Sequence, residues 1–469
     1  MKFTKFGKAL LMSALSAGVA LSITSCVQSY TVGFLYVTGT VTAQSSGNGI
    51  ISGFKIDHNT GQLRTVNGLP ISSGGSNPAR ALLAQSSRFL YVLNRGVTAS
   101  GSADCTTADP CQNANITQFA VGGNGILTPQ ETFYTQGLNP FRMISDSGQN
   151  FIFVLDHDSS VNNAPSSAAN PNLNCARVLG NDISGNPIST CGDITVFSVN
   201  PTTGRLTLVV NAQATSAAGG GPLAYFPVPA NPVDFLLSNT SLLTMSGPAP
   251  TAYPYTGGNS VFPYSYNTGQ LTVNQNTSQP ITDSGATGTL TQGTALVSGG
   301  GFIYVLDNNP IFAGGSTTPT ANSQILPFTL GSNGALQAQT GGAVPDDPTQ
   351  ENPIYLVVES KTKWLYLANQ GNNNNTSGAA ASGITGYVID PAQHTLSQMP
   401  GLPFGTGSGP QCIVEDPSNQ FIYTANFNDS TVTGQSIDQN SGVLRPLVKG
   451  SSFPVTGPAT WCLVSGRTD

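Results

Sequence analysis

The sequence has few charged residues and no long segment with the 3.6-residue apolar period of a helix. Asp, Glu, Lys and Arg make up only 8% of its 469 residues, with 16 Lys and Arg against 22 Asp and Glu. No run of basic residues is present, which argues against nucleic acid as a partner. Apolar residues occur in short Val, Ile, Leu, Phe and Tyr runs between Gly, Asn, Ser and Thr, a pattern typical of strands and turns. We therefore expect an all-β protein with almost no helix.

After the first 25 residues, no stretch is long and apolar enough to span a membrane. Three lysines precede a short apolar segment, residues 9–23, as in a secretion signal. The segment ends in Thr24-Ser25-Cys26, which resembles the lipobox of bacterial lipoproteins; the alternative is an ordinary signal peptide with an incidental cysteine. By this resemblance, residues 1–25 are a signal peptide, Cys26 is lipidated and residues 26–32 are a tether. In bacterial lipoproteins, Asp after the lipidated Cys implies retention at the inner membrane. Here the residue after Cys26 is Val27, so the resemblance implies an outer-membrane lipoprotein, facing the periplasm or exposed at the surface.

The remaining six cysteines fit an oxidising compartment. Cys105 and Cys111 lie close together, as do Cys175 and Cys191, and we expect each pair to form a local disulfide. Cys412 and Cys462 could pair, remain buried thiols or, least favoured, leave Cys412 as a nucleophile. No Cys-x-x-Cys or Cys/His spacing indicates zinc or haem, and we expect no cofactor.

One motif recurs along the chain: a Pro, a Phe or Trp eleven residues later, an aromatic residue two further on, and a closing Asn or Asp. Four copies occupy residues 77–94, 139–156, 352–369 and 409–426, and two weaker copies occupy 231–247 and 299–308. A half copy, GFLYVTG, begins at residue 33, and the other half, GPATWCLVSG, begins at residue 457. The two termini therefore share one repeat.

A second motif, a polar turn that ends in Leu and usually contains Gly, alternates with the first. It occurs seven times, at residues 57–63, 121–127, 200–206, 266–271, 330–336, 390–396 and 438–444. Asn, Ser or Thr before Gly between two short strands indicates a hairpin turn. Seven such units of four strands predict a seven-bladed β-propeller over residues 33–469, closed by N- and C-terminal strands within one blade.

The repeated Phe-Ile/Leu-Tyr-Val-x-Asn segment and the Asn-Thr-Gly-x-Leu turn resemble the seven-bladed propeller lactonases. This family contains the propeller-type 6-phosphogluconolactonases and the fungal muconate-lactonizing propellers. The resemblance covers nearly all of the chain after the signal and implies the propeller fold and a lactonase-like activity. Where members often have Pro-Arg-His at the innermost strand, this chain has Pro78-Ala79-Arg80 and Pro140-Phe141-Arg142.

The Pro-bearing strands are expected to be the innermost strands of the blades. The loops that follow the second strands are long, and they all lie at one end of the ring, which we call the top. These loops span about residues 95–115, 157–193, 247–259, 308–323 and 370–383. Arg80 and Arg142 share one repeat position in adjacent blades, so both guanidinium groups could reach the channel mouth and hold a carboxylate, phosphate or oxyanion. The alternative is a salt bridge to Asp156 or Asp307.

His157, between Asp156 and Asp158, is a candidate general base; otherwise it is a solvated loop residue. Five residues close the second strands and are candidate binding groups: Asn94, Asp156, Asp307, Asn369 and Asn426. Their converging oxygens could hold Ca²⁺, but capping of strand ends is the commoner role, and we expect no metal.

Two functions follow from these features. The first is an exported, lipid-anchored hydrolase that opens a small sugar or organic-acid lactone at the top of the channel. The alternative is a non-enzymatic propeller of the cell envelope that binds a glycan, peptide or protein through its long top loops. We expect a monomer that contacts the membrane through its lipid only.

The lipobox yields the first prediction. Cys26→Ser removes the thiol that would carry the lipid, so the chain should lose lipid labelling and leave the membrane fraction. Membrane fractionation and labelling that match the parent would contradict the anchor.

Overall fold

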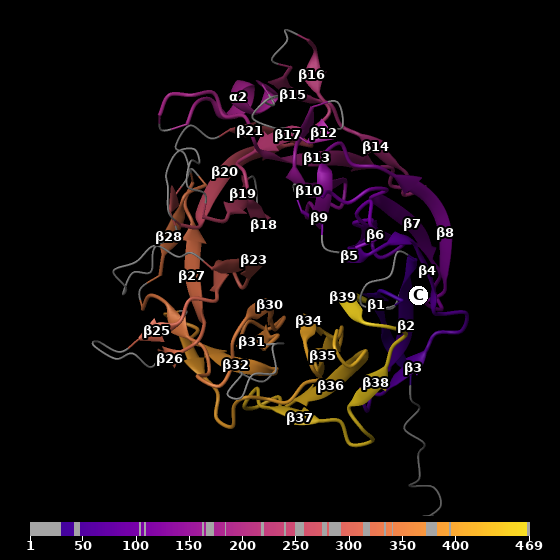
Figure 1. Cartoon of the computed structure of the whole chain (residues 1–469). Helices are drawn as coiled ribbons and strands as arrows, with labels where there is room; N and C mark the ends of the chain where they lie inside the picture. Colours follow the sequence, from indigo (N-terminus) through magenta and orange to yellow (C-terminus); the bar gives the residue numbers. More distant parts are fainter. Residues whose placement is uncertain are drawn as a thin grey trace, which may run out of the picture.

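The computed structural model is a ring of β-sheets around a central opening (Figure 1). It describes residues 30–41, 47–102, 105–106, 109–161, 164–165, 173–182, 184–216, 220–238, 241–248, 258–273, 279–280, 292–312, 319–332, 334–339, 341–371, 382–393 and 395–466. Seven sheets of four or five strands form the blades, and all their pairings are antiparallel. The predicted seven-bladed propeller is confirmed.

The strands of each blade run in order from the channel outward. Blade 1 contains β39 (Ala459–Gly466), β1 (Thr31–Gly39), β2 (Asn48–Asp57), β3 (Leu63–Thr65) and β4 (Ile71–Ser76). Blade 2 contains β5 (Pro78–Ala84), β6 (Phe89–Asn94), β7 (Asn115–Val121) and β8 (Leu127–Phe133). Blade 3 contains β9 (Leu138–Ser145), β10 (Phe151–Asp158), β13 (Gly192–Val199), β14 (Leu206–Leu208) and β17 (Phe226–Val228). Blade 4 contains β18 (Pro232–Ser238), β19 (Ser241–Ser246), β20 (Ser260–Asn267), β21 (Gln270–Val273) and β22 (Gln279–Pro280).

Blade 5 contains β23 (Gly293–Gly299), β24 (Phe302–Asp307), β27 (Gln324–Leu330), β28 (Leu336–Ala338) and β29 (Val344–Pro345). Blade 6 contains β30 (Pro353–Val358), β31 (Trp364–Asn369), β32 (Gly383–Ile389) and β33 (Leu396–Gln398). Blade 7 contains β34 (Pro410–Glu415), β35 (Phe421–Asn426), β36 (Thr431–Ile437), β37 (Leu444–Pro446) and β38 (Ser452–Pro454). In five blades the outermost strand is split, so that two short pieces share one edge of the third strand.

The ring closes within blade 1, as the split repeat predicts. The C-terminal strand β39 pairs with β1 from Gly33↔Gly466 to Gly39↔Ala459, and it lies between β1 and the channel. This pairing leaves no inner strand of the described ring without a partner, which removes an edge open to aggregation.

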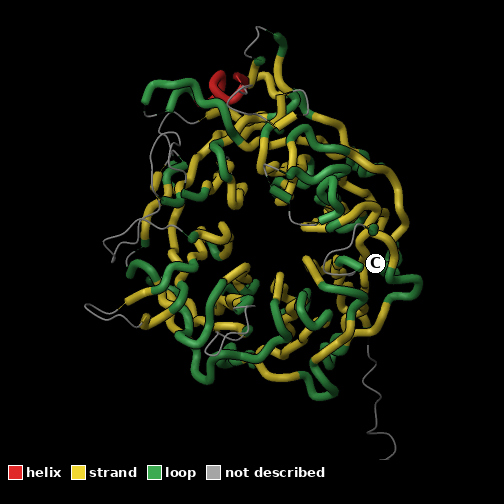
Figure 2. Tube along the Cα trace, viewed as in Figure 1, coloured by secondary structure: helices red, strands yellow, loops and turns green. Residues whose placement is uncertain are grey.

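Small elements decorate the ring. They are the hairpins β11 (Ser160–Val161) with β12 (Ala164–Pro165), β15 (Asn211–Thr215) with β16 (Pro222–Leu223), and β25 (Ile311–Phe312) with β26 (Pro319–Ala321), and the helix α2 (Leu173–Leu179). Among the described residues this helix is the exception to an all-β structure, and it stands at the rim of the ring (Figure 2). Among the described residues, no helix is long and apolar enough to cross a membrane.

The core is divided among the blade interfaces rather than gathered in one centre. Seven clusters of buried apolar side chains each join two neighbouring blades. Successive side chains of a strand point to opposite faces of its sheet. In β1, Phe34 and Tyr36 therefore pack against blade 2, while Leu35 and Val37 pack against blade 7. A blade buries its second face only when its neighbour is in place.

The two sequence motifs meet at these interfaces. The Tyr of the second strand donates a hydrogen bond to the Gly carbonyl in the Gly-Leu turn of the next blade: Tyr36 to Gly125, 2.9 Å, Tyr366 to Gly442, 2.7 Å, Tyr423 to Gly61, 2.7 Å, and Tyr91 to Gly204. The Phe or Trp two residues earlier covers the same glycine: Phe34 on Gly125, Phe89 on Gly204, Trp364 on Gly442 and Phe421 on Gly61. The recurring Phe-x-Tyr segment and the recurring turn are thus the two halves of one contact between blades.

The Asn-Pro dipeptide that opens most repeats also has a physical basis. The residue before the Pro is in the left-handed region, with φ of 55° at Asn77, 58° at Asn139, 56° at Asn231 and 58° at Asn352. Asn tolerates this conformation better than most residues. A register shift follows directly, between Pro78 and Arg80 and at the matching place in the other blades. The innermost strands of blades 2, 3, 4 and 6 therefore enter the ring with the same local geometry.

Buried polar groups close the upper ends of the second strands. Asn94, Asp156, Asp307, Asn369 and Asn426 each have an exposed fraction of 0%. Their partners lie in the same blades: Asn94 Nδ2 donates to Asn115 Oδ1 at 2.9 Å, Asn426 Nδ2 to Thr433 Oγ1 at 3.0 Å, Asn369 Nδ2 to Thr385 Oγ1 at 3.1 Å, and Gln324 Nε2 donates to Asp307 Oδ2 at 2.9 Å. These contacts are typical of residues that cap strand ends. Because the five residues are fully buried, they present no exposed atom to a ligand, as the predicted binding role would require.

Blade 3 differs from the others because two carboxyl groups meet at this place. Asp156 and Asp193 lie opposite each other on β10 and β13, and Thr135 Oγ1 donates to Asp156 Oδ1 at 2.9 Å. Burial raises the pKa of both carboxyls well above the ordinary value, and the charge of Asp156 raises the pKa of Asp193 further. If both were ionised, the Asp193 oxygens would have no donor. The pair therefore holds a proton. In blade 2 the same position is filled by the side-chain amides of Asn94 and Asn115.

The glycine contact yields a prediction. Gly61 has φ +66°, and a Cβ on it would lie 2.5 Å from the Phe421 ring, whereas Gly68 has φ +83° and open space around it. Gly68→Ala should lower the free energy of unfolding by about 1–2 kcal/mol, the cost of a left-handed Ala. Gly61→Ala should lose a further ~1–3 kcal/mol through overpacking of the blade interface. Equal losses in denaturant unfolding would refute the proposed contact.

The carboxyl pair of Asp156 and Asp193 yields a second prediction about stability. Because the folded pKa values are raised, the pair's contribution to stability is fully present below the ordinary Asp pKa and is lost as pH rises through the folded values. Asp193→Asn supplies an amide donor to Asp156 and should raise the free energy of unfolding at pH 8 by about 1–3 kcal/mol. It should also flatten the fall in Tm between pH 5 and 8. Asp109→Asn, an exposed carboxyl with the same charge change, is the control; parallel Tm curves for the parent and both variants would exclude a shared proton.

Candidate functional site

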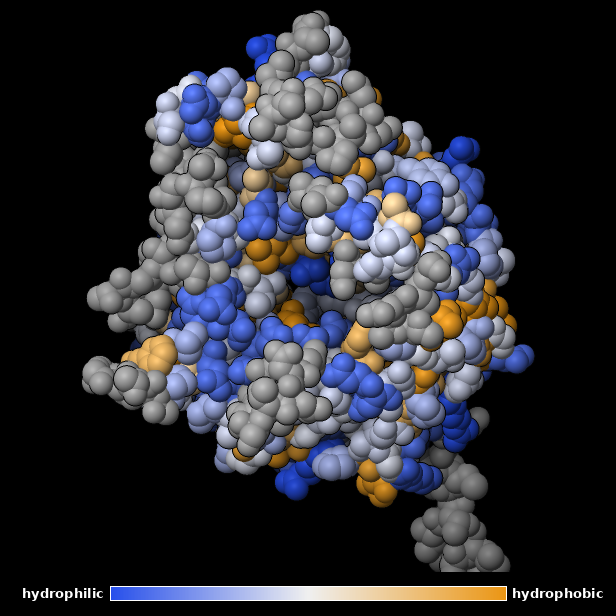
Figure 3. Space-filling view, in the orientation of Figure 1, coloured by the Kyte–Doolittle hydropathy of each residue, from blue (hydrophilic) through white to orange (hydrophobic). Residues whose placement is uncertain are grey.

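One position of the innermost strands supplies the side chains at the channel mouth. It is the residue directly after the register shift, called the channel position: Trp461, Arg80, Arg142, Asp234, Ala295, Tyr355 and Cys412 in blades 1 to 7. A hollow lies over the middle of the ring, and its wall combines strongly hydrophilic with hydrophobic surface (Figure 3). The predicted pairing of Arg80 and Arg142 at one repeat position is present in the fold.

Arg142 is held by a neighbour from the next blade. Its Nε lies 3.1 Å from Asp234 Oδ1, and the exposed fractions of the two side chains are 22% and 9%. Asp234 is itself fixed, because its Oδ1 accepts from the Phe235 amide at 2.9 Å and its Oδ2 from the Leu296 amide at 2.8 Å. The ion pair of Arg142 is therefore with Asp234 rather than with Asp156 or Asp307. It orients the guanidinium without neutralising the site.

Arg80 carries the unbalanced charge. Its guanidinium carbon lies 4.0 Å from the centre of the Trp461 ring, and its Nη1 donates to the Ala79 carbonyl at 2.8 Å. Burial lowers the pKa of Arg80 well below its ordinary value, and the charge of Arg142 lowers it further, while Asp234 and Tyr355 act in the opposite direction. Two guanidinium groups thus face one carboxylate among the described channel positions. A net positive, partly desolvated mouth favours an anion or a carbonyl oxygen.

Two aromatic residues complete the mouth. The rings of Tyr355 and Trp461 meet edge to face, with centroids 5.1 Å apart and an interplanar angle of 77°. Burial is the main cause of the raised pKa of Tyr355, so its hydroxyl stays protonated and can donate a hydrogen bond. Aromatic faces beside hydrogen-bond donors suit the apolar and polar sides of a small oxygenated ring.

His157 lies near this mouth but does not contact Arg142 in the described structure. Its Nδ1 is 3.2 Å from Asp158 Oδ2, and its side chain is 35% exposed. The Phe141 ring is near both, 5.2 Å from the Arg142 guanidinium carbon and 6.1 Å from the His157 ring. Of the two carboxylates expected to flank His157, only Asp158 does so, because Asp156 turns inward to Asp193.

A further network fixes the histidine's partner. Asn139 Nδ2 donates to Asp158 Oδ2 at 2.7 Å, and Asn139 Oδ1 accepts from the Cys111 amide at 2.7 Å. The disulfide-bonded loop thereby supports Asp158, which holds His157 through Nδ1 while the histidine side chain stays 35% exposed. This is the arrangement of a general base with an orienting carboxylate.

The structure contains three disulfides. Both predicted local bonds are present, Cys105–Cys111 and Cys175–Cys191, each within a long top loop. Of the alternatives for the third pair, the structure has the disulfide Cys412–Cys462, with Cα atoms 5.8 Å apart. Cys26 lies outside the described residues.

Sequence reasoning missed Asp234, Tyr355 and Trp461. The signal was present for the first two, since each lies two residues after a repeat Pro, as Arg80 and Arg142 do. In the last strand, the channel position does not lie two residues after the repeat Pro, Pro458. The register pairs Ala459 with Gly39, so Ala459 takes the place of the Pro, Trp461 takes the channel position and Cys462 follows it.

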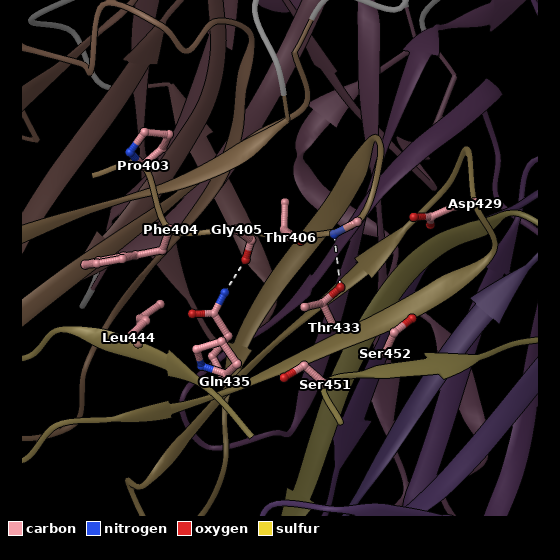
Figure 4. Close-up of a pocket in the computed structure, with 12 residues that line it drawn as sticks. Pro403, Phe404, Gly405, Thr406, Asp429, Thr433, Gln435, Leu444, Ser451 and Ser452 are labelled. Atoms are coloured by element: carbon pink, nitrogen blue, oxygen red, sulfur yellow. Dashed lines mark hydrogen bonds between the residues drawn. The ribbon is translucent and has the colours of Figure 1, made fainter. Parts of the chain in front are cut away.

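A groove of about 540 Å³ lies away from the mouth, between the outer parts of blades 6 and 7. Gln435 donates to the Gly405 carbonyl across it, and the Gly407 amide donates to Thr433 Oγ1 at 3.0 Å (Figure 4). It is lined mostly by neutral hydroxyl, amide and apolar groups, with Asp429 as the charged side chain. It has no histidine or cationic group to act on an ester, so the mouth is the better candidate. Among the described residues, no group of three or more His, Cys, Asp or Glu is placed to bind a metal ion.

The fold agrees with comparisons to solved structures. The periplasmic gluconolactonase of Pseudomonas aeruginosa superimposes with a TM-score of 0.60 at 16% identity, covering 93% of this chain and 100% of that one. A protein of Bacteroides fragilis, provisionally assigned as a 6-phosphogluconolactonase, gives 0.59 at 16% identity, covering 92% and 98%. These likenesses show the fold. No curated protein matches the sequence significantly.

The family model for the seven-bladed β-propeller lactonases matches residues 48–164 and 310–461. Together these segments span more than half of the chain, and they include Arg80, Arg142 and Tyr355 of the mouth. The chain therefore belongs to the seven-bladed β-propeller lactonase family.

Proposed function

We propose that the protein hydrolyses a small sugar or organic-acid lactone at the channel mouth. The observation that carries the proposal is that the guanidinium groups of Arg80 and Arg142 occupy equivalent positions of adjacent blades. One carboxylate at these positions, Asp234 of the next blade, pairs with Arg142 and leaves the charge of Arg80 unbalanced. Membership of the lactonase family supports the reaction class. The names of the solved relatives, a gluconolactonase among them, favour a sugar lactone.

In the proposed reaction, the lactone carbonyl accepts hydrogen bonds from the two guanidinium groups. His157 Nε2 takes a proton from water, whose oxygen attacks the carbonyl carbon, and the charge that develops on the carbonyl oxygen is stabilised by both arginines. The ring C–O bond then breaks, and the leaving oxygen takes the proton back from His157. The product is an open-chain hydroxy acid; its carboxyl group releases its proton to solvent, and the resulting carboxylate remains paired with the arginines until it dissociates. Because the Phe141 ring is near both His157 and Arg142, the attacking water would lie beside this ring.

We also propose that the protein acts outside the cytoplasm, anchored by lipid at Cys26. Three disulfides support an oxidising compartment. A periplasmic relative of the same fold is consistent with it.

The test is hydrolysis of a panel of aldono- and hydroxy-acid lactones by the chain from Val27. Arg80→Met and Arg142→Met should each lower kcat/KM about 10- to 150-fold, since a charge-assisted hydrogen bond contributes roughly 1.5–3 kcal/mol. Arg205→Met is the matched control, because Arg205 forms a surface ion pair with Glu131 at 3.2 Å and is 66% exposed; it should leave kcat/KM unchanged. His157→Ala should lower kcat with little change in KM.

Two outcomes would count against this proposal. If a lactone is hydrolysed and the Arg80, Arg142 and His157 variants match the parent, the reaction takes place elsewhere. If no lactone in the panel is hydrolysed but the open-chain acids or an envelope glycan bind, the non-enzymatic binding function replaces it.

A further inference from the structure

The disulfide Cys412–Cys462 joins the two innermost strands that meet at the ring closure, β34 of blade 7 and β39 of blade 1. These strands belong to different sheets and share no backbone ladder. Cys412 occupies the channel position of blade 7, and Cys462 directly follows Trp461, the channel position of blade 1. Both cysteines are buried, with exposed fractions of 0% and 2%. The bond is thus part of the mouth rather than of an outer loop.

Trp461 makes contacts on both sides of this bond. Its ring lies under the Arg80 guanidinium of blade 2 at 4.0 Å, and it also meets Tyr355 of blade 6 at 5.1 Å. To reach Tyr355 it must extend past blade 7, and it can do so because the channel position there is a small cysteine drawn toward Cys462. A larger or freely rotating side chain at residue 412 would occupy the same space.

The backbone alone gives Trp461 limited support. The strand β39 is hydrogen-bonded only to β1, and its register shifts at the upper end, between the pairs of Thr38 and Gly39. Its other edge faces the channel. The residue that carries the indole is therefore held on one side by the ladder and on the other by the disulfide of the residue next to it.

We infer that the Cys412–Cys462 disulfide is a positioning element of the channel mouth. It fixes Trp461 against Tyr355 and beneath Arg80, and so sets where the unbalanced guanidinium points. This role depends on the contacts of Trp461 and holds whether the ligand is a lactone or a glycan. In the absence of the bond, the fold keeps its blades while Trp461 loses its fixed place.

The chain offers a direct reporter, because it has only two tryptophans. Trp364 occupies the place that Phe34, Phe89 and Phe421 fill in other blades, so Trp364→Phe leaves Trp461 as the single tryptophan in a native-like setting. In that background, Cys412→Ala with Cys462→Ala should increase acrylamide quenching of Trp461 about twofold or more, as expected for local opening without global unfolding. Far-UV circular dichroism should still show the β-sheet spectrum.

Two controls separate positioning from general loss of stability. Cys175→Ala with Cys191→Ala removes a disulfide from the rim and should leave Trp461 quenching unchanged. Ile56→Ala creates a cavity at the same interface of blades 7 and 1, on β2, which does not pair with β39; it should lower Tm yet leave quenching near the parent value. Similar quenching in this variant and in the double alanine variant would overturn the inference.

Reduction provides a second measurement if the double alanine variant does not fold. Dithiothreitol donates two electrons and two protons, so the Cys412–Cys462 bond becomes two thiols and the reductant becomes its cyclic disulfide. Mass analysis of alkylated peptides identifies molecules in which this bond is broken. Increased Trp461 quenching in that folded population supports the inference, and quenching equal to the oxidised chain refutes it.

Discussion

The ring depends on one repeated contact, in which an aromatic side chain of one blade closes over a glycine turn of the next. The Phe or Trp covers the glycine and the Tyr hydroxyl satisfies its carbonyl, so a single segment supplies both packing and hydrogen bonding. Because each blade buries its second face only against a neighbour, these contacts are mutually dependent around the circle. The strand β39 then has to complete blade 1, since an incomplete blade would expose two interface clusters at once.

This frame leaves the channel position free to vary. The contact between blades uses the second strand and the outer turn, while five of the residues after the register shift on the innermost strands contact one another: Arg80 with Trp461, Trp461 with Tyr355, and Arg142 with Asp234. Its occupants accordingly range from Arg to Asp, Ala, Tyr, Cys and Trp with no change in blade geometry. The same separation explains the upper strand ends, where amides in blade 2 and a carboxyl pair in blade 3 fill one structural place. Function can change at the channel without rebuilding the ring.

The fold was predictable because its signals repeat, and a motif seen seven times outweighs any single ambiguous segment. The Phe-x-Tyr segment, the Gly-Leu turn and the split terminal repeat each correspond to a contact in the ring. The site was only partly predictable. Arg80 and Arg142 followed from a shared repeat position, whereas Asp234 lies in the weaker repeat copy at residues 231–247 and Tyr355 lies within an apolar run that is typical of a core strand. Trp461 could not be placed by counting, because the register shift moves the last strand by one residue relative to its Pro. The inward turn of Asp156 depends on its partner Asp193, which lies 37 residues further along the chain beyond a long loop.

The distribution of charge gives the mouth its character. In a chain with only 8% charged residues, two arginines at adjacent channel positions are a notable concentration of charge. Asp234 receives two backbone amides besides Arg142, so little of its negative charge is left for Arg80. Arg80 instead rests on the Trp461 face, a weaker partner for a cation than a carboxylate. The lowered pKa of Arg80 reflects the same deficit, which arises from burial and from the neighbouring Arg142. An incoming carboxylate or developing oxyanion would supply the missing negative charge, and the aromatic pair would exclude the water that otherwise competes for it.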